Sequence, residues 1–254
     1  MLCYTLGGVL TALIVLFFVM PKYSELWDYK KAIRIGTLES YETYLLKSVN
    51  RLYENDILMR YERLQFEIAD SLFRSANYKE AAIFVYKCAE RGNSTAQDYT
   101  GYLYRNGFIE PKSDSIAVEW YKKSARQGNA AGQNSLAYMY RRGIGGLPQD
   151  NALAVEWYRI AAEQGDAAGQ TNLGYMYKAG LGVPVDCTEA LNLFRKSAEQ
   201  GFAYGQFLLG EMYEYGCETL PKDVTEARYW YSKAAEQGNK SAKERLSILS
   251  DKSY

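Results

Sequence analysis

The sequence of 254 residues contains no histidine. Histidine is the side chain whose charge changes most readily near neutral pH, and it is the commonest metal ligand. Its absence excludes Ser-His-Asp triads, Cys-His dyads and most catalytic zinc sites. The sequence also has no nucleophile elbow, phosphate-binding loop or cluster of metal ligands. We therefore expect a protein that is not an enzyme and that uses no cofactor, metal ion or small-molecule substrate.

The chain also lacks an excess of charge of either sign, because 30 Lys and Arg residues balance 30 Asp and Glu residues. Proteins that bind nucleic acid present an excess of basic residues to the phosphates. A nucleic-acid partner is therefore not expected. Any electrostatic contribution to binding must come from a local arrangement of charges.

Cysteine is scarce, and no CxxC pair occurs among Cys3, Cys88, Cys187 and Cys217. An even number of cysteines permits disulfides, although Cys3 lies in a hydrophobic run and Cys88 on an apolar helix face. Our preferred interpretation is four free thiols. The alternative is one bridge between Cys187 and Cys217, which both fall in predicted turns and would need an oxidising compartment.

A single long hydrophobic run, residues 2–20, carries no charged side chain. As a helix it comes close to the ~30 Å thickness of the hydrocarbon core of a bilayer. No basic residue precedes the run, which favours an uncleaved anchor over a signal peptide. The nearest basic residues all follow it: Lys22, Lys30, Lys31 and Arg34. The run predicts a single-pass protein, with the bacterial inner membrane as its expected location. The charge bias places the rest of the chain in the cytoplasm, while a periplasmic orientation stays open.

Residues 22–62 are predicted to form a helical stalk. Leu38, Tyr41 and Leu45 recur at spacings of three and four, as an amphipathic helix requires. We interpret the stalk as a pair of packed helices that cover the first repeat. A dimeric coiled coil is the alternative, but the pattern spans barely two heptads.

The remainder of the chain repeats one pattern every 36 or 37 residues. The pattern reads A-x-G-Q-x-x-L-G-x-M-Y-x-x-G and then A-x-x-W-Y-x-x-A-A-E-Q-G. Leu136 and Tyr140 lie on one face of a first helix, and Ala154 and Tyr158 on one face of a second. Each copy is thus two amphipathic helices, which need stacked neighbours to bury their apolar faces. The four copies are residues 94–129, 130–166, 167–202 and 203–239.

Helix ends and packing residues also recur through the copies. Glycines whose backbone can adopt the left-handed conformation are predicted to end the first helices, at Gly143, Gly180 and Gly216. Aspartates are predicted to cap the start of the second helices, at Asp114, Asp150, Asp186 and Asp223. Tryptophans at one repeat position, Trp120, Trp157 and Trp230, are predicted to pack inside the array.

This pattern resembles the Sel1-like repeat family, which is related to tetratricopeptide repeats. The resemblance implies an all-α, right-handed α-solenoid of helix-turn-helix repeats, here preceded by the membrane helix and the stalk. Residues 63–93 resemble a degenerate tetratricopeptide-like repeat. Residues 240–254 begin like another first helix and then turn polar, which suits a C-terminal cap.

The resemblance also implies a binding surface on the concave side, which the first helices line. If Leu136 and Tyr140 are buried, the polar residues of the same helix emerge on that side. Cations beside tyrosines would suit an acidic or aromatic-bearing protein segment, and the last repeat reverses the sign. The alternative is that these are solvated positions in a chain with 24 tyrosines. The predicted site is Arg74, Tyr102, Arg105, Asn134, Tyr138, Arg141, Arg142, Tyr175, Lys178, Glu211 and Glu214.

Two functions are consistent with this sequence. The first is a membrane-anchored adaptor or scaffold that binds a protein partner. The second is an immunity protein or inhibitor that neutralises a secreted toxic enzyme at the membrane, as the resemblance implies for some bacterial Sel1-like proteins. No residue pattern selects between them.

Overall fold

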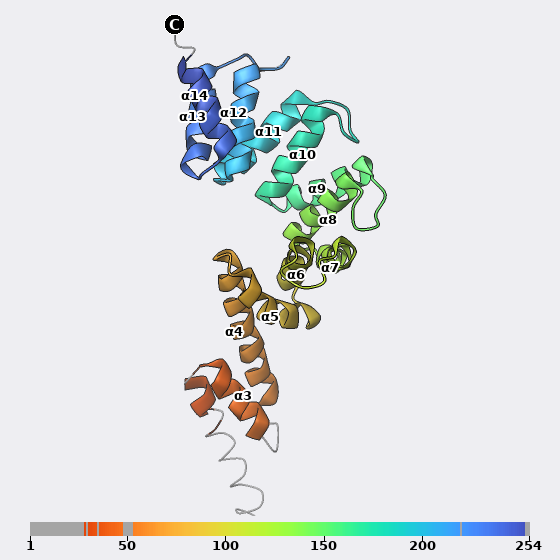
Figure 1. Ribbon diagram of the computed structural model, residues 1–254, viewed down its shortest axis with the longest axis vertical. Helices are drawn as coiled ribbons and strands as arrows, with labels where there is room; N and C mark the ends of the chain where they lie inside the picture. The colour runs from red at the N-terminus through yellow and green to blue at the C-terminus, as the bar shows by residue number, and fades with distance from the viewer. Residues whose placement is uncertain (1–27, 29, 35, 48–52, 219, 252–254) are drawn as a thin grey trace, which may run out of the picture. The chain divides into compact units, whose positions relative to one another are not determined.

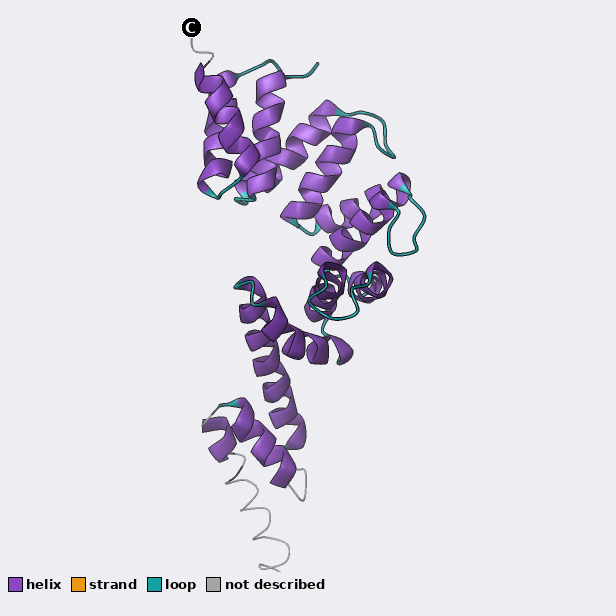
Figure 2. Cartoon of the chain, viewed as in Figure 1, coloured by secondary structure: helices purple, strands orange, loops and turns teal. Residues whose placement is uncertain are grey.

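The computed structural model describes residues 28, 30–34, 36–47, 53–218 and 220–251. Almost all of this part is helical, with short connecting loops (Figure 2). The predicted membrane helix at residues 2–20 lies outside the described residues. Among the helices that are described, none is both long and apolar enough to cross a membrane. The chain divides into two compact units, Met1–Cys88 and Ala89–Tyr254.

In the N-terminal unit, helix α3 (Leu38–Lys47) packs against helix α4 (Glu54–Arg74). Tyr41 and Tyr44 of α3 meet Ile57 and Tyr61 of α4 in a small core. Helix α4 continues through residue 62, where the stalk was predicted to end. Helix α5 (Tyr78–Glu90) follows it.

The second unit is a stack of helix pairs closed by a single helix, so the predicted all-α repeat solenoid is confirmed (Figure 1). Each pair packs against the next one along the chain. Helix α14 (Lys240–Asp251) packs on the last pair and buries Ala242 and Leu249 there. The pairs are α6 (Ser94–Asn106) with α7 (Asp114–Arg126), α8 (Ala130–Arg142) with α9 (Asn151–Glu163), α10 (Ala167–Ala179) with α11 (Cys187–Glu199), and α12 (Ala203–Tyr215) with α13 (Val224–Glu236).

The helix starts follow the predicted capping pattern with one correction. Asp150, Asp186 and Asp223 each accept a hydrogen bond from a backbone N–H of the first turn, as expected. The expectation for Asp114 was wrong, because Ser113 is the N-cap and Asp114 is the first helical residue. Ser113 lies four residues before Ala117, just as Asp150 lies four residues before Ala154.

The helix ends and the tryptophans also follow the pattern, with one exception. Gly143 and Gly180 are left-handed C-caps, as predicted. Gly216 has a positive φ but an extended ψ of −178°, so it ends its helix in another conformation. Trp120 is buried, while Trp157 and Trp230 are partly buried against the hydrophobic clusters of the array.

A buried glutamine in each repeat connects three helices. Gln170 of α10 donates from Nε2 to the carbonyl oxygen of Ala162 in α9, at 3.3 Å. Its Oε1 accepts from Nε2 of Gln200, the C-cap of α11, at 2.8 Å. The same pair of bonds forms at Gln97, Gln133 and Gln206. We call these the glutamine bridges. They satisfy amides that would otherwise be buried without partners, and they fix each helix pair against its predecessor.

A disulfide joins Cys187 to Cys217, so our preference for four free thiols was wrong for these two residues. Cys3 lies outside the described residues, and Cys88 is buried in α5. The bond connects the first residue of α11 in the third repeat to the loop after α12 in the fourth. This is the bridge that the sequence offered as the alternative to free thiols, and the stacking of the repeats brings its two cysteines together.

The disulfide lies where earlier repeats make a close backbone contact. A Cβ added to Gly182 would lie 2.5 Å from the backbone of Asn151, the first residue of α9. One added to Gly145 would lie 2.6 Å from the carbonyl oxygen of Asp114, the first residue of α7. The fourth repeat has Glu218 at this position, and a side chain there excludes the same close approach. The covalent bond therefore joins the third and fourth repeats where the glycine contact is missing.

We expect Gln170→Met to lower the free energy of unfolding by roughly 1–3 kcal/mol, since it leaves the Ala162 carbonyl and the Gln200 amide without their partner. Gln200→Met removes the same Gln170–Gln200 bond by changing its exposed partner. This variant should lower the free energy of unfolding by less than about 1 kcal/mol, because water at the surface can donate in place of the lost amide. Urea denaturation followed by circular dichroism measures both. If both variants lost the same free energy of unfolding, the result would contradict the role assigned to the buried Gln170 amide.

Reduction of the Cys187–Cys217 disulfide should lower the stability of the repeats by about 2–4 kcal/mol, because the bond closes a loop with a sequence separation of 30 residues. Thermal unfolding with and without dithiothreitol measures the effect. The variant Cys187→Ser/Cys217→Ser should melt like the reduced wild type and should not respond to dithiothreitol. A wild type whose melting is unchanged after reduction, verified by mass spectrometry, would show that the bond adds no stability.

Candidate binding surface

The first helices of the repeats form the inner layer of the stack. Helix α8 contacts both α6 and α10, and α10 also contacts α12. Among the described helices, the second helices of neighbouring repeats do not contact one another to this extent. In a curved two-layer array, the layer whose members lie closer together is on the inside of the curve. The first helices therefore line the concave side.

A row of aromatic rings and cations runs along this inner layer. The Arg105 guanidinium carbon lies 4.3 Å from the ring centroid of Tyr138 in the next repeat. The Arg141 guanidinium carbon lies 5.5 Å from the Tyr138 centroid and 5.6 Å from the Tyr175 centroid. We define Tyr102, Arg105, Tyr138, Arg141 and Tyr175 as the tyrosine–arginine row. Counting positions in the repeat predicted the helix face on which these residues lie. The structure shows in addition that the two arginines lie against tyrosine rings.

In the part of the chain that the structure describes, no carboxylate forms an ion pair with Arg105 or Arg141, so the positive charge of this row is not neutralised there. A guanidinium stacked on a ring keeps its in-plane N–H groups available for other acceptors. Each cation–ring contact contributes on the order of 0.5–1 kcal/mol at an exposed site. The row therefore presents ordered donors and positive charge.

The fourth repeat does not reverse the sign of the surface, contrary to the expectation from Glu211 and Glu214. Lys178 occupies the position of Arg105 and Arg141, and its Nζ lies 3.1 Å from Glu211 Oε2. Glu214 forms an ion pair with Arg245 of α14 and accepts a hydrogen bond of 2.8 Å from Tyr231. Both acids are thus paired within the protein.

Buried phenols from the second helices lie beneath the row. Burial raises the pKa of Tyr158 to about 12, while the nearby Arg141 guanidinium opposes the rise. Burial also raises the pKa of Tyr121 strongly, and Arg105 opposes it. Among the described residues, neither Arg141 Nε nor Tyr158 Oη has a hydrogen-bond partner. Both guanidinium groups thus lie between half-buried tyrosine rings and a buried phenol.

A buried carboxyl that the sequence did not reveal lies between α6 and α8. Asp98 is 8% exposed and accepts a hydrogen bond of 2.8 Å from Ser135 Oγ. Burial raises the pKa of Asp98 from 3.8 to about 6; the Ser135 hydrogen bond opposes the rise, and Asp166 adds to it. The only sequence signal was its place in the repeat, one residue after the buried Gln97.

Besides Lys178, Glu211 and Glu214, three more predicted site residues do not belong to the row. Asn134 occupies the repeat position of Asp98, and its Oδ1 accepts a hydrogen bond of 2.7 Å from Asn172 Nδ2. It therefore links α8 to α10 and does not project freely, because its side of α8 faces the neighbouring first helix. Arg74 lies in α4 of the N-terminal unit and pairs with Asp70 at 2.7 Å. Arg142 is exposed on α8, and among the described cation–ring contacts none involves it.

Tyr204 is a surface residue that the sequence reasoning missed. It is 45% exposed and stacks on Phe207, with ring centroids 6.2 Å apart. Burial raises the pKa of Tyr204 above its ordinary value, Glu211 and Tyr175 add to the rise, and Arg141 opposes it. The phenol therefore lies within electrostatic range of the row. The sequence does mark this residue, because Tyr204 is an aromatic residue where the earlier copies have the smaller Thr95, Ala131 and Ala168.

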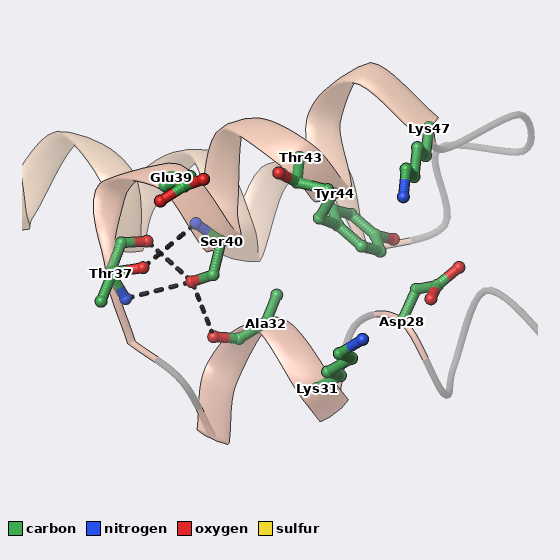
Figure 3. A pocket seen from close by; sticks show the side chains of 9 residues that line it. All are labelled: Asp28, Lys31, Ala32, Thr37, Glu39, Ser40, Thr43, Tyr44 and Lys47. Carbon is green, nitrogen blue, oxygen red and sulfur yellow. Dashed lines mark hydrogen bonds between the residues drawn. The ribbon is translucent and has the colours of Figure 1, made fainter.

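A separate cavity lies in the N-terminal unit (Figure 3). It has a volume of about 270 Å³, and Lys31 and Lys47 line it together with Asp28 and Glu39. The Ser40 hydroxyl on its wall already bonds the backbone carbonyls of Ala32 and Thr37, at 3.2 and 2.7 Å. Charges of both signs line the cavity, so it has no marked preference for an anion or a cation. In the described part of the chain, no group of three or more acidic or cysteine side chains is placed to hold a metal ion.

Comparison with known protein families agrees with the repeat boundaries found above. The family model described as the Sel1 repeat matches residues 94–129, 130–166, 167–202 and 203–239. No curated protein matches the chain in the corresponding sequence comparison.

Several solved structures are similar to this chain. A Sel1 repeat protein from Oxalobacter formigenes is 33% identical with a TM-score of 0.56, over 70% of this chain and 73% of that one. The protective antigen c5321 of uropathogenic Escherichia coli is 28% identical with a TM-score of 0.51, over 91% of this chain and 60% of its own. The immunity protein PA5088 from Pseudomonas aeruginosa is 25% identical with a TM-score of 0.50, over 68% of this chain and 66% of its own. The chain thus spans less than two thirds of the length of the last two.

Replacing Asp98 by Asn, the residue of the next repeat, should stabilise the protein at pH 7.5 by roughly 1–3 kcal/mol. The raised pKa favours the protonated carboxyl in the folded state, so ionised Asp98 costs stability above pH 6. The cost falls as the pH drops through 6 and is absent below the ordinary value of 3.8.

Urea denaturation of wild type and Asp98→Asn at pH 7.5 and pH 4.5 measures this difference. The gain at pH 7.5 should shrink markedly at pH 4.5. A gain that is the same at both pH values would show that ionisation of Asp98 is not its cause.

Proposed function

Since this chain belongs to the Sel1 repeat family, whose proteins are generally interaction modules and not enzymes, we propose that it is an adaptor that binds a protein segment on the tyrosine–arginine row. The observation that carries this proposal is the chain of contacts from Arg105 through Tyr138 and Arg141 to Tyr175. Tyr and Arg are the residues that, with Trp, most often dominate the energy of protein interfaces.

The shape of the surface favours a protein segment over a small molecule. Small molecules bind in enclosed, mostly apolar pockets, typically of ~300–1,000 Å³. The row instead extends over three successive first helices. An extended or helical segment can contact all three together, because each helix offers a ring or a cation at the same height in the repeat.

The charge of the row supports an acidic partner. Arg105 and Arg141 have no carboxylate partner among the described residues, and their planar groups suit two-point binding of a carboxylate. Acidic side chains in the bound segment would complete the coordination of these two groups.

The adaptor is tethered, in this proposal, to the bacterial inner membrane by residues 2–20, which carry no charge. The Cys187–Cys217 disulfide supports a periplasmic location for the repeats, since disulfides persist in oxidising compartments and are rare in the cytoplasm. This orientation is the reverse of the one that the charge bias favoured.

The likeness to PA5088 supports a second candidate function. PA5088 is an immunity protein, and its alignment with this chain covers 68% of the chain at 25% identity. In this alternative the bound segment belongs to a secreted toxic enzyme, and the tether holds the inhibitor where that enzyme acts.

The proposal can be tested by photo-crosslinking in living cells, with benzoylphenylalanine in place of Tyr138. A discrete protein adduct is expected at Tyr138 and not at Tyr229, an exposed position on the second helix α13. The further change Arg105→Glu/Arg141→Glu should reduce the adduct about tenfold or more, because it replaces attraction by repulsion.

Arg142→Glu is the matched control, since it changes charge on the same helix without touching a ring, and it should leave the adduct in place. Circular dichroism confirms that each variant is folded. An adduct that persists in Arg105→Glu/Arg141→Glu would contradict the proposal. Mass spectrometry of the adduct separates the two functions, because a secreted hydrolytic or toxic enzyme would favour the immunity alternative.

A further inference from the structure

The inner surface changes its chemistry along the stack. The position held by Asp98 and Asn134 in the first two repeats has hydrogen-bonded polar groups between the first helices. The corresponding residue in the fourth repeat is Phe207, which packs with the hydrophobic cluster of α11 and α12. Over α6 and α8 the surface therefore combines arginines with tyrosine rings, and over α12 it is aromatic without an arginine.

Tyr204 and Phe207 form a supported aromatic patch at this end. Their rings stack 6.2 Å apart, and Phe207 lies 5.7 Å from Tyr231, which is fully buried. The exposed ring of Tyr204 thus rests on a ring that is itself packed against the core. An aromatic side chain held in this way loses little conformational freedom on binding, which is typical of an interface anchor.

The acids near this patch do not repel an acidic partner. Glu211 is paired with Lys178, and Glu214 is paired with Arg245. Among the described residues of this surface, Arg105 and Arg141 therefore carry positive charge that no carboxylate pairs with. Tyr175 lies between the two parts, since its ring contacts Arg141 and packs on the same hydrophobic cluster as Phe207.

We propose that the inner surface is a two-part site for one protein segment, in which Arg105 and Arg141 bind carboxylates while Tyr204 and Phe207 bind an aromatic or large apolar side chain. This inference rests on the proposed function and names the chemistry of its partner. The aromatic patch on α12 is two first helices away from Arg141 and three away from Arg105. At ~8–10 Å per helix the separations are roughly 16–20 Å and 24–30 Å, which an extended chain covers in about five to nine residues. The partner segment carries an acidic pair and, at about that spacing, an aromatic or large apolar residue.

The test is selection from a phage-displayed library of random peptides, with the full-length chain in detergent micelles as the bait. Wild type should enrich peptides that contain both Asp or Glu and a Trp, Phe, Tyr or Leu at the stated spacing. Arg105→Glu/Arg141→Glu should lose the acidic preference and keep the aromatic one. Tyr204→Ala should lose the aromatic preference and keep the acidic one.

Two features of the chain make these variants informative. Ala is the residue of the second and third repeats at the position of Tyr204, so Tyr204→Ala restores the repeat pattern and should leave the fold intact. Tyr229→Ala removes an equally exposed tyrosine from α13 and should change neither preference. For a selected peptide, each of the two half-site variants should weaken binding about tenfold, and only the arginine variant should abolish its salt dependence.

The outcomes separate this inference from the proposal on which it rests. Enrichment of basic peptides, or of acidic peptides without an apolar residue, would overturn the two-part site while leaving a protein-binding surface. Enrichment that is unchanged in both half-site variants would place binding elsewhere on the chain. Failure of wild type to enrich any peptide over an empty micelle would count against the proposed function itself.

Discussion

The glutamine bridges are the constraint on which the repeat array depends. Each buried amide donates to a carbonyl of the preceding helix pair and accepts from the last residue of its own pair. A slip of one helix against its neighbour would leave the buried amide Nε2 and the carbonyl to which it donates without partners, so the bridges define one register at every seam between repeats. Apolar contacts between small residues such as Ala137, Ala154 and Ala161 can then pack closely without having to specify that register.

A fixed register means that one contact recurs at each seam, and its chemistry depends on only two residues. The cation near the end of one first helix lies against the residue 33 or 34 positions later, in the next first helix. This residue is Tyr138 for Arg105, Tyr175 for Arg141 and Glu211 for Lys178. Where it is a tyrosine, the ring orients the cation and leaves its charge available. Where it is a glutamate, the cation is neutralised. A single difference between copies therefore decides where the positive surface ends.

The sequence predicted features that each repeat contains by itself. The helix pairs, the glycine at Gly143 and the caps at Asp150 and Asp186 follow from periodicity and local chemistry, and all are found in the structure. Features that need two repeats were missed or were not the preferred interpretation. The pairing of Glu211 and the burial of Asp98 arise between helices of different copies, whereas a helical-face count gives only the side on which a residue lies. The Cys187–Cys217 bond also joins two copies, and the sequence offered it only as the alternative to free thiols. Aligning the sequence with itself at an offset of 33 residues, instead of the repeat period of 36 or 37, places Lys178 opposite Glu211.

The differences between copies gather in the fourth repeat, and they are connected. Tyr204 and Phe207 replace small or polar residues and make the aromatic part of the surface, while Glu218 replaces the glycine that brings earlier loops close to the preceding repeat. The loss of that contact weakens the seam that the aromatic patch needs for its position relative to Arg141. The disulfide lies at this seam, so it compensates there for the missing backbone contact. In the proposed two-part site, the covalent bond therefore adds to the Gln206 bridge at this seam and supports the position of the aromatic part relative to Arg141.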